Sequence, residues 1–436
     1  MTRVEDTRSG TRVAAWHLVT SEYPPQTGGV SDYTRLVAEG LAAAGDEVHV
    51  WCPSLKAGEI RADEIRANEA QAGEDEGEGG MDAAGSSGVR GVSIHRELGS
   101  FGPSDLRRAG RLLDSYARPR RLLVQYVPHG YGYRAMNVPF CLWLWKRARV
   151  EGDRVELMVH EPFCAFGEGS LKQDAAAAVH RLMTTILLRA AHRVWTSIPA
   201  WEKLWRPYAL GRRVEFAWLP VPSTIPVAVD ASRVAALRAR YAPQDDALLV
   251  GHFGTYARYI TGQLEKLLPA LLARNPSVSV LLIGRGGEPV RDELSRLHPS
   301  LSARLHATGV LPRRELSTHL AACDLLVQPF PDGVSSRRTS VMAALAHGLP
   351  VVTNEGRLTE PLWSESGAVK LVAAGDLEEL IIEAGRLLGD ASGRERLGAA
   401  ALSLYRERFD VSRIVVRLRG GDSETPVAES GVVLAG

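Results

Sequence analysis

Short apolar runs alternate with helical patterns along most of the chain. In the first half, runs rich in aliphatic and β-branched residues predict strands at 13–20, 47–51, 122–127, 155–159 and 193–197. After the first run, apolar residues at Val30, Tyr33, Val37 and Leu41 have the spacing of one buried helix face. The repeated order of strand, helix and strand predicts a parallel sheet covered by helices.

The same alternation starts again in the second half. Apolar runs predict strands at 248–253, 278–283, 325–328, 350–353 and 369–372. A helix is predicted over 376–388 with Asp376 as its N-cap, and an amphipathic segment at 397–409 is expected to end the folded part.

A proline-rich segment, residues 219–226, separates the two halves and is typical of an interdomain linker. We predict an α/β protein of two doubly wound, Rossmann-like domains that face a cleft, where ligands bind outside the carboxyl ends of the strands. The expected boundaries are 1–222, 223–410 and a C-terminal segment, 411–436, whose tail is disordered. Residues 57–88 are rich in Glu, Gly, Ala and Asp, which predicts a disordered insertion in the first domain.

Composition narrows the function classes. With 436 residues, 45% apolar content and a formal net charge of +1, the chain resembles an ordinary soluble protein of two domains and gives no overall argument for binding nucleic acid. The four cysteines show no metal-binding or disulfide spacing, and no signal peptide or membrane span is expected, so we predict a cytoplasmic protein. Arginine greatly outnumbers lysine, which suggests a GC-rich, bacterial source and lowers the weight of any single arginine.

The segment from Gly333 to Thr353 is the most informative part of the chain. It begins with small, polar and basic residues (Ser335, Ser336, Arg337, Arg338, Thr339), continues as a short apolar helix and ends in a strand. Thr339 or Ser340 is expected to cap the helix, and Gly348 stands where a C-terminal glycine belongs. Free amide groups and guanidinium groups at a helix N-terminus favour an anion such as phosphate. The alternative is a solvated arginine pair before a core helix.

The loop at 21–30 offers a second candidate site. Gly28 and Gly29 allow backbone amide groups to approach a ligand at the start of the following helix. The spacing is not GxGxxG, which argues against a nicotinamide enzyme. A tight strand-to-helix turn is the alternative.

These motifs occur together in a known order. Pro24-Pro25, Gly28-Gly29-Val30 and Gly45-Asp46-Glu47-Val48 are followed in the second half by 282–288, 307–312, 322–329 and 347–353. In this order the chain resembles the family-four glycosyltransferases of the GT-B fold over nearly its whole length. The resemblance also allows a C-terminal helix that crosses back to the first domain.

The resemblance implies roles for matching positions. His160 would face the donor sugar, although a histidine after a strand is as often structural. Gly28 and Gly29 would line the donor diphosphate or the acceptor. The remaining donor-side positions are Gly254, Arg258, Thr261, Thr308, Gly309 and Val310, the last three beside the nucleotide base.

The sequence also departs from the family pattern. Ser335 and Ala343 stand where the family has paired glutamates, and Thr261 stands at a lysine position. We therefore expect Arg337 or Arg338 to stabilise the leaving diphosphate, with Ser335, Ser336 and Thr339 also on the donor side.

The acceptor is expected beside the loop at 126–134. Tyr126, His129, Tyr131 and Arg134 could form a sugar-binding pocket, or the aromatic residues could pack inward. An aromatic and basic cluster of Trp143, Trp145, Lys146, Arg147 and Arg149 allows a peripheral membrane contact if the acceptor is lipid-linked. Core tryptophans beside solvated charges are the alternative.

Together these features predict a hexosyltransferase-type glycosyltransferase (EC 2.4), as in polysaccharide biosynthesis. It would transfer a sugar from a nucleotide-sugar donor to a glycan, lipid-linked or small-molecule acceptor, without a metal or other cofactor. Retention of anomeric configuration is implied by the resemblance alone. One rival is a non-catalytic GT-B subunit that regulates or scaffolds a glycosyltransferase, and another is a sugar epimerase or phosphorylase. A pyridoxal-dependent phosphorylase is disfavoured because Lys370 falls on a predicted strand.

Overall fold

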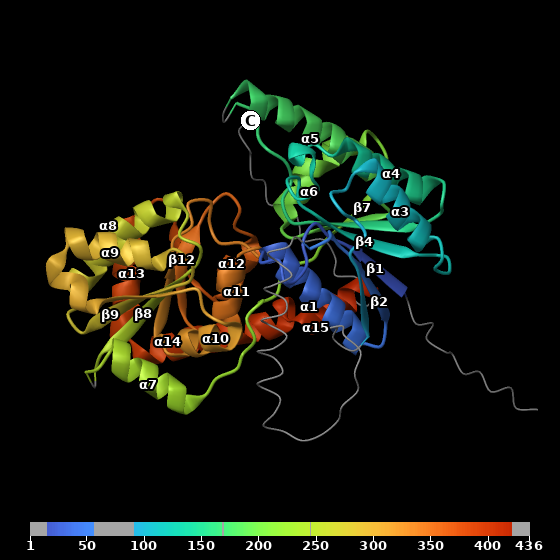
Figure 1. Cartoon of the computed structure of the whole chain (residues 1–436). Coiled ribbons are helices and arrows are strands. Elements are labelled where there is room, and N and C mark those ends of the chain that lie inside the picture. Colours follow the sequence, from blue (N-terminus) through green and yellow to red (C-terminus); the bar gives the residue numbers. More distant parts are fainter. Residues whose placement is uncertain (1–14, 56–90, 168–169, 245, 421–436) are drawn as a thin grey trace, which may run out of the picture.

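The computed structural model describes residues 15–55, 91–167, 170–244 and 246–420 (Figure 1). The insertion predicted at 57–88 and the tail predicted to be disordered after Gly420 lie outside the described residues. Within the described part, no helix combines the length and apolar character that a bilayer-spanning helix needs.

The first domain is built on a seven-stranded parallel sheet with the order β3-β2-β1-β4-β5-β6-β7. Its strands are β1 (Ala15–Val19), β2 (Glu47–Trp51), β3 (Val92–His95), β4 (Arg121–Tyr126), β5 (Arg154–Val159), β6 (Arg193–Thr196) and β7 (Glu215–Trp218). Its helices are α1 (Gly29–Ala43), α3 (Pro103–Leu113), α4 (Val138–Arg149), α5 (Leu171–Ala190) and α6 (Pro199–Trp205), with short 3₁₀ turns at Tyr133–Ala135 and Arg206–Ala209.

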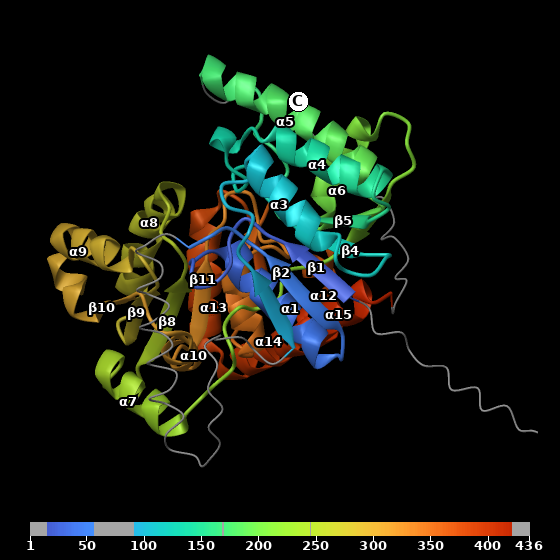
Figure 2. The same ribbon diagram turned by 45° about the vertical axis from the view of Figure 1, so that its right-hand side comes forward.

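Both faces of this sheet are apolar, as a parallel sheet covered by helices requires. On β4, Leu122 and Val124 pack with α3, α4 and α5, whereas Leu123 belongs to the core under α1. Figures 1 and 2 show α1 and α15 on one side of the sheet and α3, α4 and α5 on the other. The carboxyl ends of the strands are therefore left for ligands.

The second domain has a six-stranded parallel sheet with the order β10-β9-β8-β11-β12-β13. Its strands are β8 (Leu248–Phe253), β9 (Val278–Ile283), β10 (Leu305–Gly309), β11 (Leu325–Gln328), β12 (Val351–Glu355) and β13 (Lys370–Ala373). Its helices are α7 (Ala231–Tyr241), α8 (Arg258–Arg274), α9 (Gly287–Leu297), α10 (Arg313–Ala321), α11 (Thr339–Ala346), α12 (Pro361–Ser366), α13 (Leu377–Gly389) and α14 (Ala391–Leu404), with a 3₁₀ turn at Pro299–Arg304 and a π-helical turn at Tyr405–Phe409. The predicted architecture of two doubly wound domains is confirmed.

The sequence predicted that the folded part ends at Phe409, but the fold continues beyond this residue. Helix α15 (Val411–Leu418) follows and returns to the first domain, where it packs on α1 (Figure 2). Ile414, Val415 and Leu418 are buried in the core of the first domain, and Arg121 donates a hydrogen bond of 2.6 Å to the carbonyl of Leu418. The helix that the resemblance allowed to cross back is present.

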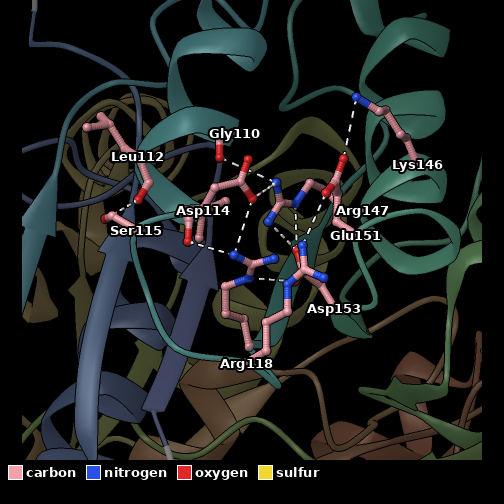
Figure 3. A network of polar contacts seen from close by, with 11 residues as sticks. Gly110, Leu112, Asp114, Ser115, Arg118, Lys146, Arg147, Glu151 and Asp153 are labelled. Carbon is pink, nitrogen blue, oxygen red and sulfur yellow. Dashed lines mark hydrogen bonds and ion pairs between the residues drawn. The ribbon is translucent and has the colours of Figure 1, made fainter.

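A buried ionic network stiffens the outer layer of the first domain (Figure 3). Asp153, at the start of β5, is fully buried and accepts hydrogen bonds from Nε of Arg120 at 2.6 Å and Nε of Arg147 at 2.5 Å. Asp114 also pairs with both arginines. Since a buried charge is costly without partners, this network explains why Arg147 points inward from α4.

Candidate active site

The loops after β5 and β11 bring charged residues of both domains together. Asp332, between β11 and α11, forms ion pairs with Arg337 at 3.2 Å and with Arg338. Burial, and then the charge of Arg338, lower the pKa of Arg337, whereas Asp332 and Glu161 act in the opposite direction. Glu161 follows β5 in the first domain, so the Arg337 guanidinium interacts electrostatically with one carboxylate from each domain.

We name the loop between β11 and α11, residues 329–338, the arginine loop; it has hydrogen-bonding groups that no described residue uses. Nε of Arg337, Nε of Arg338 and Oγ of Ser335 are all buried and have no partner among the described residues. Arg338 also stacks over Phe330, with its guanidinium carbon 4.4 Å from the ring centre, and Arg337 lies 5.5 Å from the Trp201 ring. Because unsatisfied buried donors are costly, this loop is suited to an additional anionic ligand.

His160, directly after β5, is nearly buried. Its Nε2 lies 2.9 Å from Oε1 of Gln125, and the edge of the Tyr33 ring packs against it at 4.8 Å between ring centres. An amide oxygen can only accept, so Nε2 carries the proton and Nδ1 keeps its lone pair. Burial lowers the pKa of His160 to about 3, which keeps the imidazole neutral near pH 7.

Ser336 has a different position from the one predicted. It is fully buried between the domains, where its hydroxyl contacts the carboxylate of Glu360 and donates to the carbonyl of Ser197 at 2.8 Å. Trp218 donates to the same hydroxyl at 3.1 Å. The side chain of Ser336 is therefore part of the domain junction, and its assignment to the donor site is wrong.

Glu360 fixes this junction from the second domain. Its carboxylate accepts hydrogen bonds from the backbone amide of Ser336 at 3.0 Å and from the Trp363 indole at 2.7 Å. Burial raises the pKa of Glu360, and these hydrogen bonds oppose the shift. With its oxygens committed to these partners, Glu360 is a structural group and no replacement for a missing sugar-binding glutamate.

Glycines bring the loops after β8, β9 and β10 close together. A Cβ on Gly284, whose φ is +112°, would lie 2.5 Å from the carbonyl oxygen of Gly254. Thr308 accepts a hydrogen bond of 3.3 Å from the amide of Gly284 and donates one of 3.0 Å to the carbonyl of Gly309. The predicted donor residues Gly254, Thr308 and Gly309 thus lie together at the carboxyl ends of strands in the second sheet. Val310, beside them, is 67% exposed.

The remaining donor-side residues are less well defined. Arg258 begins α8 with an exposed side chain, and the Thr261 hydroxyl donates to the Arg258 carbonyl at 3.0 Å. Within the described part of the chain, no hydrogen bond or ion pair joins either side chain to the arginine loop. Thr339 is the first residue of α11, whose N-cap is Arg338 without a side-chain cap, so the predicted cap at Thr339 or Ser340 is wrong. Gly348, with φ of +64°, has the predicted C-terminal role.

The glycine loop of the first domain is occupied by one of its own carboxylates. Glu22 accepts a hydrogen bond of 2.9 Å from the amide of Ser31, in the first turn of α1. A Cβ on Gly28 would lie 2.1 Å from this carboxylate, which is the far end of a flexible side chain, whereas a Cβ on Gly29 would meet no atom within 4 Å. A phosphate could use this helix end only if Glu22 moved away.

Half of the predicted acceptor residues do not reach solvent. Tyr126 and Tyr131 are fully buried in the core with Phe140 and Trp205, so their assignment to a sugar-binding pocket is wrong. His129 and Arg134 are exposed, and Nδ1 of His129 lies 3.7 Å from the Glu161 carboxylate. Gly132 and the three residues after it all have positive φ, a left-handed turn that holds Arg134 at the surface.

Sequence reasoning missed four groups that shape the site. Asp332 and Glu161 were not among the predicted site residues. Gln125 and Glu22 gave no signal, since each acts through a contact with a residue that no local pattern connects to it. The described residues contain no cluster of three or more His, Cys, Asp or Glu side chains arranged to hold a metal ion.

Comparison with known proteins relates the second domain to a described family. Residues 245–390, about a third of the chain, match the family described as Glycosyl transferases group 1. This match covers most of the second domain, including the glycine loops and the arginine loop. No curated protein sequence matches the chain.

Solved structures resemble the chain over nearly its full length. Sucrose-phosphate synthase from Thermosynechococcus elongatus is 17% identical with a TM-score of 0.64, and the match covers 93% of this chain and 97% of that one. HepE from Anabaena in complex with UDP and glucose is 16% identical with a TM-score of 0.62, covering 93% and 98%. WaaG, a glycosyltransferase involved in lipopolysaccharide biosynthesis, is 13% identical with a TM-score of 0.59, covering 94% and 100%. The chain has the GT-B fold, as its sequence predicted.

Proposed function

We propose that this GT-B chain is a glycosyltransferase that uses a nucleotide-sugar donor. The observation that carries the proposal is the arginine loop, in which three buried donors have no partner among the described residues and lie next to Asp332 and near Glu161 of the opposite domain. Departure of a nucleoside diphosphate places negative charge on phosphate oxygens, and fixed guanidinium groups stabilise that charge.

The proposed reaction needs no metal or other cofactor. Arg337 or Arg338 would bind the leaving diphosphate, and Ser335 would donate a further hydrogen bond once its hydroxyl has a ligand. His160, neutral and fixed by Gln125, would contact the donor sugar through Nδ1, not as a charged group. Retention of configuration and a hexose as the sugar remain part of the proposal.

UDP is the first nucleotide to test. Solved structures of Anabaena HepE contain UDP, UDP-glucose or UDP with glucose, and an Escherichia coli protein with the same fold was solved with UDP-2-fluoro glucose. We place the donor at the glycine loops of the second domain and the acceptor beside His129 and Arg134. A glycan, a lipid-linked sugar or a small molecule would serve as the acceptor, and we expect the reaction in the cytoplasm.

A non-catalytic GT-B subunit is the second candidate function. Two observations favour it: Asp332 already pairs with both arginines, and Glu22 occupies the helix end in the first domain. In that role the charged cluster would only stabilise the junction between the domains.

Calorimetric titration of UDP, GDP, ADP and TDP, followed by an assay of donor hydrolysis, separates the two functions. We expect one nucleotide to bind, and each of Arg337→Ala and Arg338→Ala to lower the hydrolysis rate, one of them by roughly 10²–10³. Arg357→Ala is the matched control, because Arg357 is an exposed arginine in the loop after β12.

The outcomes point in opposite directions. Binding of one nucleotide that is lost in the double arginine variant and kept in the Arg357 variant would support the transferase. If the folded protein binds none of the four nucleotides, the transferase proposal fails and the non-catalytic subunit is favoured.

A further inference from the structure

The outer surface of the first domain carries an apolar and basic stripe along α4. Leu142, Trp145, Lys146 and Arg149 are exposed and follow the spacing of one helix face. Trp143 and Arg147, which the sequence grouped with them, point inward; Arg147 enters the network around Asp153 (Figure 3). The structure thus divides the aromatic and basic cluster into a core half and a surface half.

Helix α5 extends this stripe. It packs beside α4, and its exposed residues Leu182 and Arg189 are two turns apart. We name the surface formed by Leu142, Trp145, Lys146, Arg149, Leu182 and Arg189 the α4–α5 face. At its end a cavity of about 330 Å³ is lined by Trp145, Arg149, Arg189, Ala209, Leu210 and Arg212.

The cavity concentrates positive charge without any acidic lining residue. Arg149 and Arg212 are partly used by carbonyls at the C-terminus of α5, which belong to Arg189, Leu188 and Ala191. The Arg189 guanidinium has no hydrogen-bond or ion-pair partner among the described residues. Burial, and then the charges of Arg149 and Arg189, lower the pKa of Arg212, because both cations lie close to it. Capping alone does not require a third arginine there.

We propose that the α4–α5 face binds the surface of a bilayer that contains anionic phospholipid. Arginine and lysine beside exposed Leu, Trp and Leu210 side chains are typical of surfaces that lie in the headgroup region, where cations meet phosphates and apolar side chains insert shallowly. Glu151, 3.6 Å from Lys146, pairs with one cation of this face, and no ion pair to Arg149 or Arg189 is present among the described residues.

A second copy of the chain fits this face poorly. In a two-fold dimer the same patch meets itself, so the arginines of one copy would face those of the other. Because α4 and α5 cover a face of the sheet, a bilayer on their outer side would leave the carboxyl ends of the strands accessible (Figure 1). The inference does not depend on transferase activity.

Sedimentation with lipid vesicles tests the inference. We expect the wild-type chain to sediment with vesicles of phosphatidylglycerol and phosphatidylcholine, and not with phosphatidylcholine alone. Lys146→Gln/Arg189→Gln should weaken binding to the anionic vesicles about 30-fold, since each cation near an anionic surface contributes about fivefold. Lys266→Gln/Arg396→Gln, two exposed cations of the second domain, is the matched control and should bind normally.

Three results would overturn the inference. The first is failure of the wild type to sediment with anionic vesicles, and the second is an equal loss of binding in the test and control variants. The third is a change of tryptophan fluorescence with inorganic phosphate but not with vesicles. Loss of this change in Trp145→Phe would assign the signal to Trp145. The cavity would then be a site for a small anion. Circular dichroism of each variant confirms that it is folded.

Discussion

The chemistry available to His160 depends on one neighbouring side chain. Gln125 is fully buried on β4, and its amide oxygen fixes the proton of His160 on Nε2. Its backbone carbonyl also accepts a hydrogen bond of 2.5 Å from Tyr131, so β4 and the following loop hold the glutamine in place. Gln125 is therefore a positioning residue for His160.

Gln125→Glu should convert His160 into a titratable group. A carboxylate about 3 Å from Nε2 stabilises the imidazolium, and such a neighbour typically raises a pKa by about 1–3 units. The pKa of His160 should rise from about 3 accordingly. NMR titration of the imidazole would measure the change. Gln125→Leu, which removes the hydrogen bond without adding charge, is the control and should weaken only the tautomer preference. An Nδ1-protonated imidazole in the wild type would contradict this arrangement.

At this scale the sequence indicates which residues follow a strand but not where their side chains point. His160 was assigned from the family resemblance to a position after a predicted strand, and the arginine loop was recognised from its polar and basic residues before a short helix. Tyr126 and Tyr131 also follow or end a strand, yet they point into the core. Ser336 was misassigned because its partner Ser197 is 139 residues away, a contact that no local pattern contains.

At the scale of elements, the central strands could be predicted, as could the edge strand β13, whose predicted run is 369–372, but the other edge strands could not. The predicted runs at 47–51, 248–253, 278–283 and 325–328 match β2, β8, β9 and β11. Strands β3, β7 and β10, which were missed, are all at the edge of a sheet. An edge strand has one neighbour and is only partly buried, so it lacks the continuous apolar run of a central parallel strand.

Apolar periodicity did not predict helix α15, which only the resemblance allowed, because its apolar face is completed by another domain. It packs closely on α1 at Gly40, where a Cβ would lie 2.8 Å from Cγ2 of Val415 and 3.3 Å from Cγ2 of Val411. Only the folded first domain shows why α1 has a glycine at this position.

Gly40→Ala should therefore loosen α15 from α1. Valine is stiff about χ1 and cannot easily give way, so the added methyl should cost about 1–3 kcal/mol, partly offset by up to about 1 kcal/mol of gained helix propensity. Urea unfolding measures the change, and Gly40→Ala/Val415→Ala should recover most of it. Gly385→Ala in α13 is the control, because its Cβ would have only ordinary contacts near 3.9 Å. Equal stability of the two single variants would contradict close packing of α15.

At the scale of the whole molecule, contacts distant in sequence join the two domains. Ser336 binds Ser197, Arg313 at the start of α10 pairs with Asp32 in α1, and α15 returns to α1. The junction carries the arginine loop at its centre. Sequence periodicity predicts two domains, but their relative position rests on these contacts, which appear only after both sheets have formed.

Buried histidines in both domains should make the folded molecule sensitive to acid. Burial lowers the pKa of His17 and of His160 to about 3 and that of His252 to about 4, against 6.5 in the unfolded chain. The unfolded chain therefore binds more protons below about pH 6.5, so stability is fully present above that pH and is lost as the pH falls toward the folded values. Each such group removes up to about 1.4 kcal/mol per pH unit in this window. Glu360, whose pKa is raised by burial, acts in the opposite direction but is a single group.

His17→Gln tests this linkage in the first domain. His17 is fully buried and accepts a hydrogen bond of 3.2 Å from Trp51, so the variant should lose packing energy at every pH. Because glutamine does not titrate, that loss should shrink by roughly 1–2 kcal/mol between about pH 7 and about pH 5. Free energies of unfolding from urea titrations at both values give the difference, with the value near pH 7 as the internal control. A loss that stays constant or grows in acid would mean that His17 is not held neutral by the fold, and the acid sensitivity would then have to come from the other buried histidines.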